Sequence, residues 1–191
     1  MATLGGKRSA TSITELSASV KYLWFIYYPS FAVASAFILV RFSEDYPASW
    51  IYHAAPVKQP GYMMMASFNT LFIKYFLPLY ILFFGISLYV WKLTIVDDFL
   101  FGLINNYFCL LASIAIANKY LPFSRPTGTK NQSGRSILIF IQMIFVGLMA
   151  GIHYWINSIP GAIYIIFVAE IFLCWLIRRE LRNLAWKKIS V

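Results

Sequence analysis

Long apolar runs alternate with short polar segments along most of this chain. A transmembrane helix needs about 20 predominantly apolar residues to cross a hydrocarbon layer of about 30 Å, and these runs approach or reach that length. The pattern therefore predicts five transmembrane helices, over residues 22–40, 71–91, 99–117, 136–156 and 162–177. We expect an all-α integral membrane protein: a bundle of five transmembrane helices with a short interfacial helix after the first.

The segment between the first two runs, residues 44–60, mixes polar and apolar side chains, and we call it the elbow. Ser43, followed by Glu and Asp, offers N-capping oxygens, and residues 46–55 then carry a helical period. These ten residues are too few to cross a bilayer, and Pro56 and the Pro60-Gly61 pair end the helix. We expect the elbow helix to lie along the membrane surface, within reach of a partner outside the membrane.

The composition is that of a membrane protein. Hydrophobic residues make up 60% of the chain and charged residues 12%, so it is more apolar and less charged than an average soluble domain. With 191 residues, the chain has room for one membrane bundle, residues 22–177, between a polar segment, residues 1–21, and a basic tail, residues 178–191. The first apolar run is long enough to span and has no small-residue cleavage site after it, so it is not expected to be a signal peptide.

The positive charge predicts an orientation. The net charge is +9, and the basic residues lie in the predicted loops and tail, where they orient a chain in a membrane and do not indicate nucleic-acid binding. We expect the elbow, the loop at 118–135 and the C-terminus to be cytoplasmic, and the N-terminus to lie on the outer side of the membrane. An external N-terminus predicts that another transmembrane half precedes this one. The basic residues of the cytoplasmic side are Arg41, Lys58, Lys119, Arg125, Lys130, Arg135, Arg178, Arg179, Arg182, Lys187 and Lys188, against Lys7, Arg8, Lys21 and Lys92 outside.

The sequence ASWIYHAAPVKQPGYMMMASFNTLFIKYFLPLY, residues 48–80, resembles a signature in the later half of bacterial type-2 ABC exporter permeases. In that family a W-[IL]-Y-x-x-x-P element is followed by a Pro-Gly turn and a span with an internal proline. The later spans match only in layout and apolar composition. The resemblance implies that residues 44–60 couple to a separate ATP-hydrolysing subunit. The residues that match the signature are Trp50, Ile51, Tyr52 and Pro56.

The resemblance also implies partners. A typical permease chain of this family is considerably longer, so this chain is expected to work in the lipid bilayer with another transmembrane half or protomer. The sequence has no Gly-rich phosphate loop, so ATP would bind a separate nucleotide-binding subunit, and no cofactor or catalytic residue is expected here. Two alternatives remain open: a non-catalytic membrane scaffold or assembly subunit, and a small intramembrane enzyme that modifies lipid.

Three polar residues inside the predicted spans form a candidate intramembrane site: Asn105 and Asn106 in the third span and Glu170 midway along the fifth. A carboxylate at that depth is costly unless it is neutral, paired or facing a polar cavity. Glu170 can serve on a substrate path or proton relay, or it can be protonated and bond a neighbouring helix through Asn105, Asn106 or Gln142. The two asparagines favour interhelical hydrogen bonds over ligand binding.

The remaining candidate groups predict structure more than chemistry. His53 and His153 are expected near opposite faces of the membrane, and the two cysteines have no neighbours at metal-ligand spacing, so no metal site is expected. Gly147 and Gly151 make a G-x-x-x-G match, which permits close contact between helices.

Overall fold

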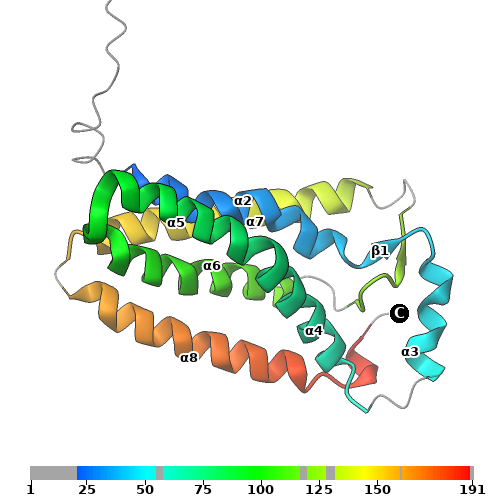
Figure 1. Cartoon of the computed structure of the whole chain (residues 1–191). Helices are drawn as coiled ribbons and strands as arrows, with labels where there is room; N and C mark the ends of the chain where they lie inside the picture. The colour runs from blue at the N-terminus through cyan, green and yellow to red at the C-terminus, as the bar shows by residue number, and fades with distance from the viewer. Residues whose placement is uncertain (1–20, 55–57, 117–119, 128–131, 160, 190–191) are drawn as a thin grey trace, which may run out of the picture.

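The computed structural model describes residues 21–189 apart from 55–57, 117–119, 128–131 and 160. Long helices run side by side, and their connections gather at the two ends of the molecule (Figure 1). The long helical elements are α2 (Tyr22–Leu39), α4 (Gly61–Leu71), the π-helical turn η2 (Phe72–Phe76), α5 (Leu77–Trp91), α6 (Val96–Ile116), α7 (Gln132–Ile156) and α8 (Ala162–Arg182). The short elements are β1 (Phe42–Ser43), η1 (Tyr46–Trp50), α3 (Ile51–Ala54), η3 (Lys92–Ile95), β2 (Arg125–Pro126) and η5 (Trp186–Lys188).

The helical class is confirmed, and so is the presence of helices fit for a membrane. Three helical stretches of the described chain are long and apolar enough to cross a bilayer: Tyr22–Leu39, Gly61–Ile116 and Ser136–Ile156. The second stretch has 56 residues and folds back on itself at η3, so it supplies two long antiparallel arms. α8 is not among these stretches, because it carries Glu170 in its interior and Arg178 and Arg179 towards its end.

The arm before the turn is one helical path from Gly61 onwards, where the sequence predicted a span from residue 71. Pro60 stands at the N-cap position, which suits a residue without a backbone N–H. The path widens into the π-helical turn η2 just before Pro78. Pro78 lacks the N–H group that would bond the carbonyl four residues earlier, and a local widening of the helix accommodates that loss.

The turn between α5 and α6 depends on an unusual backbone conformation. The backbone angle φ of Lys92 is 58°, a positive value that residues other than glycine rarely adopt. The chain reverses there, and α6 begins at Val96, three residues earlier than the predicted span. Asp97 and Asp98 consequently lie in the first turn of α6, where carboxylates complement the positive end of the helix dipole.

The core lies where α2 meets α5 and α6. Gly102 of α6 permits the closest approach, since a Cβ atom there would lie 2.2 Å from Cγ2 of Ile26 in α2. Tyr80 of α5 donates a hydrogen bond to the carbonyl of Phe99 at 2.6 Å and ties α5 to α6. Large side chains fill the rest: Tyr27, Phe68, Phe76, Phe99, Phe101, Leu110 and Leu111 are among the fully buried ones.

One end of the molecule collects the elbow, residues 120–127 and the tail. β1 pairs in parallel with β2, with Phe42 opposite Arg125 and Ser43 opposite Pro126. The sequence pattern predicted no strand here, since two residues carry no period. The opposite end holds the start of α2, the η3 turn and the connection from α7 to α8 (Figure 1). The structure therefore brings together the three segments that the charge pattern assigned to one side.

Candidate functional site

The elbow is a short, braced segment. The predicted helix over 46–55 is a 3₁₀ turn, η1, followed by one α-helical turn, α3. Pro47, near the start of η1, fixes φ and suits a tight turn. The elbow is tied down from both sides. The hydroxyl group of Tyr52 donates a hydrogen bond of 3.1 Å to the carbonyl of Pro122, and the ring of His53 lies 4.9 Å from that of Trp186 in the tail.

The described signature residues differ in exposure: Tyr52 is half-buried, and Trp50 and Ile51 are exposed. Tyr52 packs against the core, and its burial raises the pKa of its hydroxyl group. Trp50 and Ile51 instead point outwards, with 66% and 56% of their surfaces exposed. Pro56 lies outside the described residues. The elbow thus presents an apolar pair on a segment whose backbone is held by its neighbours.

The elbow continues into a helix that packs closely on α8. A Cβ atom at Gly61, the first residue of α4, would lie 2.0 Å from the carbonyl oxygen of Leu181 and 2.6 Å from that of Arg182. Only glycine fits this approach of two backbones. The start of α4 and the end of α8 are therefore in direct backbone contact at Gly61.

Asn106 holds α6 to α2 on both sides of Pro29. Its Nδ2 group donates to the carbonyls of Ile26 at 3.0 Å and Gly102 at 2.7 Å, and its Oδ1 atom accepts from the hydroxyl group of Ser30 at 2.6 Å. Pro29 lies inside α2 and removes one backbone donor from that helix. Asn106 fulfils the interhelical role that the sequence favoured for it.

The middle of the bundle contains buried polar atoms that lack partners. Among the described residues, Nδ2 of Asn105, both polar side-chain atoms of Gln142 and Oε2 of Glu170 are buried without a hydrogen bond. We call these three residues the mid-bundle group. Cys174, which is also buried, lies one helical turn after Glu170 on α8. The hydrogen bond from Glu170 to Asn105, Asn106 or Gln142 that the sequence allowed is not formed.

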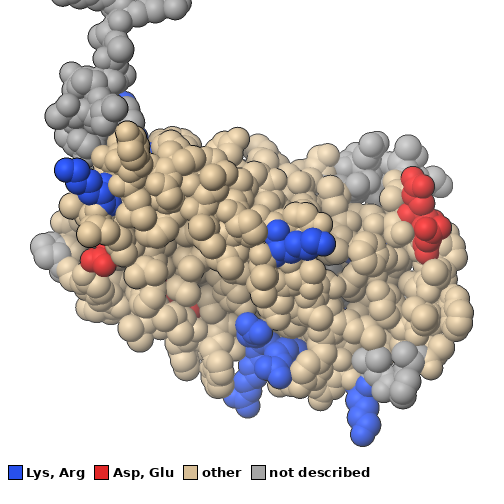
Figure 2. All heavy atoms as spheres, viewed as in Figure 1, with Lys and Arg blue, Asp and Glu red and all other residues tan. Residues whose placement is uncertain are grey.

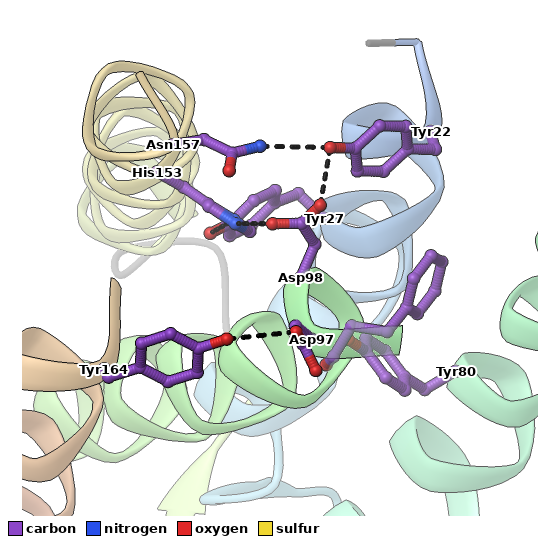
Figure 3. A network of polar contacts seen from close by, with 9 residues as sticks. Tyr22, Tyr27, Tyr80, Asp97, Asp98, His153, Asn157 and Tyr164 are labelled. Atoms are coloured by element: carbon purple, nitrogen blue, oxygen red, sulfur yellow. Dashed lines mark hydrogen bonds and ion pairs between the residues drawn. The ribbon is translucent and has the colours of Figure 1, made fainter. Parts of the chain in front are cut away.

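The sequence reasoning missed a polar cluster at the opposite end of the bundle from the elbow (Figure 3). The hydroxyl group of Tyr22 donates to Oδ2 of Asp98 at 2.5 Å, and Nδ2 of Asn157 donates to that same hydroxyl group at 3.1 Å. His153 places Nε2 3.5 Å from Oδ1 of Asp98 and Nδ1 2.9 Å from the hydroxyl group of Tyr27. We call these five residues the Asp98 cluster.

A signal for this cluster is present in the sequence. α6 and α7 run antiparallel, so a residue near the start of α6 meets one near the end of α7. Asp98 and His153 occupy those positions, and both are buried. Asp97, one residue earlier, faces another way and accepts a hydrogen bond of 3.1 Å from the hydroxyl group of the exposed Tyr164. The described residues contain no group of three His, Cys, Asp or Glu side chains suited to a metal ion.

The G-x-x-x-G residues of α7 make no close helix contact within the described chain. A Cβ atom at Gly147 or Gly151 would meet nothing within 4 Å. The two glycines instead line an open groove of about 570 Å³ beside Trp24 and Tyr27 of α2. The close helix contact that the motif permits is therefore not made at these glycines among the described residues.

Comparisons of this chain with protein-family models, with curated proteins and with solved structures found no match.

Proposed function

We propose that this chain is the membrane-spanning permease portion of an ABC-type exporter, with a separate ATPase subunit that docks on the elbow. The observation that carries the proposal is the elbow's geometry: Trp50 and Ile51 are exposed on a segment fixed by Tyr52, by the β1–β2 pair and by the tail. A soluble subunit that closes on ATP needs a rigid docking segment at the membrane surface to move the transmembrane helices. The close approach of Gly61 to α8 supports the idea that a movement of the elbow displaces α4 and α8 together.

In this proposal five helices span a bacterial cytoplasmic membrane. α2, the arm from α4 to α5, α6, α7 and α8 each cross it, and the elbow lies as an interfacial helix on the cytoplasmic side. Five crossings would place the segments after the first, third and fifth helices on one side of the membrane. The elbow, residues 120–127 and the tail are those segments, and they meet at one end of the molecule, which supports this layout. The excess of Lys and Arg on these segments supports the cytoplasmic assignment.

Two alternative functions make different demands on the polar interior. A scaffold needs its buried polar groups satisfied within the bundle, which holds for Asn106 but not for Gln142. A lipid-modifying enzyme needs its polar groups in one cavity. Asp98 contacts His153 at the bundle end, whereas Asn105 lies seven residues further along α6, or about 10 Å of helix, and Glu170 is on α8. The exporter hypothesis requires neither satisfied polar groups throughout the bundle nor polar groups gathered in one cavity.

Affinity capture of the chain from its native membranes tests the docking surface. We expect the wild-type chain to retain an ATP-hydrolysing subunit and Trp50→Ala to lose most of it, since a buried tryptophan is a common hot spot of an interface. Trp24→Ala is the matched control, because Trp24 is also exposed, at 73%, but lies on α2 away from the elbow. Absence of an ATPase from the wild-type capture, or equal retention by Trp50→Ala, would reject the proposal.

Thiol labelling tests the orientation. Cys109 and Cys174 are buried, so the exposed Glu44, replaced by cysteine, becomes the reactive site of the chain. We expect a membrane-impermeant maleimide to label Glu44→Cys only after the cells are permeabilised. Lys92→Cys, in the η3 turn, should show the reverse pattern and react in intact cells. Labelling of residue 44 in intact cells would place the elbow outside and remove any contact with a cytoplasmic ATPase.

A further inference from the structure

Two arginines near the end of α8 share one face of the helix. Arg178 and Arg182 are four residues apart, so they lie one above the other on the helix surface. Arg178 is half-buried and Arg182 is exposed. Figure 2 shows basic side chains gathered over α8, while most of the surrounding face carries no charge.

Tyrosines from two other helices hold these arginines. Nη1 of Arg178 donates to the hydroxyl group of Tyr107 in α6 at 2.9 Å. Arg182 lies over the ring of Tyr62 in α4, with Cζ 5.0 Å from the centroid, and Nη2 donates to its hydroxyl group at 3.4 Å. Both guanidinium groups are therefore positioned by neutral partners where α4 and α6 meet α8. We call these four residues the arginine site.

No carboxylate among the described residues forms an ion pair with the arginine site. Within the described residues, the only ion pair joins His153 to Asp98 at the far end of the bundle. Glu180 lies two residues from each arginine along α8, a spacing at which side chains do not face each other. Like charges four residues apart repel, so an anion between the two guanidinium groups would stabilise this arrangement.

The surface next to the arginine site is apolar. Phe172 and Trp175, earlier on α8, stack with ring centroids 6.0 Å apart and are both more than half exposed. Arg179 adds a third cation, with Cζ 5.5 Å from the centroid of Trp175. Aromatic rings followed by arginines mark the level at which a helix leaves the hydrocarbon layer. An anion at that level with an apolar tail beside it has the chemistry of a phospholipid.

We infer that the arginine site binds the phosphate group of an anionic phospholipid, with the acyl chains lying along Phe172 and Trp175. Guanidinium groups suit phosphate oxygens because they can donate two parallel hydrogen bonds. Tyr107 and Tyr62 each accept one hydrogen bond from these guanidinium groups, whose other N–H groups can donate to the lipid phosphate. This inference rests on the proposed crossing of the membrane by α8 and does not depend on an ATPase partner.

Binding of a fluorescent phosphatidylglycerol to the purified chain in neutral detergent tests the inference. Arg178→Gln/Arg182→Gln should weaken binding about thirtyfold, which corresponds to about 2 kcal/mol for two basic side chains at an anionic surface. Lys187→Gln/Lys188→Gln removes the same charge from exposed positions in the nearby tail and should weaken binding less than about threefold. Phosphatidylcholine should not compete with the labelled lipid.

Three results would overturn the site. An equal loss of lipid affinity in the two double variants would mean that binding depends on the total positive charge at this end of the bundle and not on the arginine site. Competition by phosphatidylcholine would mean that acyl chains alone are recognised. Competition by inorganic phosphate at the same concentration would assign the site to a free anion. Because Arg178 also contacts Tyr107, the exposed Arg182 is changed alone as a second variant. Arg182→Gln should keep the wild-type melting temperature in phosphatidylcholine and still weaken phosphatidylglycerol binding about fivefold.

Discussion

At the bundle end, Asp98 and its neighbours form a continuous set of polar contacts, whereas in the middle of the bundle Asn105, Gln142 and Glu170 keep buried polar atoms without partners. The first group joins α2, α6 and the end of α7, whereas the second joins α6, α7 and α8. Asp98, His153, Asn105, Gln142 and Glu170 are all buried. Nε2 of His153 has no hydrogen bond, but it lies 3.5 Å from the carboxylate of Asp98. A satisfied network stabilises one packing of the helices, while an unsatisfied buried group costs about 1–3 kcal/mol. The contacts of the first group therefore stabilise the packing of α2, α6 and α7, whereas the unpartnered atoms of the second group add no such stabilisation within the described residues.

The neighbours Asn105 and Asn106 show the same contrast on a single helix turn. Asn106 uses both ends of its amide to hold α2. Asn105 accepts only a weak contact of 3.5 Å from the thiol of Cys109, and its Nδ2 group is unpartnered. Residue type and depth are equal, so position on the helix face decides which asparagine stabilises the fold.

The largest expected effect comes from breaking the Asp98 cluster. Asp98→Leu leaves His153 and the hydroxyl group of Tyr22 without their partner, and removal of one member of a buried pair costs about 3–5 kcal/mol. We expect the free energy of unfolding, measured by SDS titration in mixed micelles, to fall by about 3 kcal/mol. Asp97→Leu is the control, because the exposed Asp97 makes one surface hydrogen bond, and its loss should cost less than about 1 kcal/mol. Equal losses would refute the distinction between the two aspartates.

A smaller effect is expected at the asparagine pair. Asn106→Leu removes three hydrogen bonds between and within helices and should lower the free energy of unfolding by about 2 kcal/mol. Asn105→Leu should change it by less than about 0.5 kcal/mol or raise it, since it replaces an unsatisfied amide with an apolar side chain of similar volume. The same SDS titration compares the two variants. A greater loss at Asn105 would show that the hydrogen bonds of Asn106 are not what holds α6 to α2.

These contrasts also mark how far the sequence could take the prediction. Apolar runs and their lengths predict helices fit for a membrane, because backbone groups in hydrocarbon must be bonded within the segment. The role of Asn106 followed from the same rule. The β1–β2 pair and the split of the elbow into two short turns could not be predicted, because two to five residues carry no period. The Asp98 cluster depended on which faces of α2, α6 and α7 meet, and no pattern within one helix contains that information.

The smallest expected change in stability, and the sharpest test of the comparison, lies at Glu170. Its side chain is 95% buried and lacks a partner at Oε2, so it adds nothing to the fold that an apolar residue would not supply. Glu170→Leu should leave the free energy of unfolding unchanged or raise it by about 1 kcal/mol, because a buried polar group replaced by a well-packed apolar one is often neutral or stabilising. If the chain is the permease that we propose, the same variant should also abolish the coupling of ATP hydrolysis in a complex reconstituted with its ATPase, since a costly carboxylate inside a membrane bundle is expected to act on substrate or protons. Glu170→Gln separates charge from shape: it keeps the volume and loses the ionisable group, and we expect the same loss of coupling. A fall in stability of about 2 kcal/mol or more in Glu170→Leu, with coupling retained, would show that Glu170 supports the fold as Asp98 does. The middle and the end of the bundle would then differ only in degree.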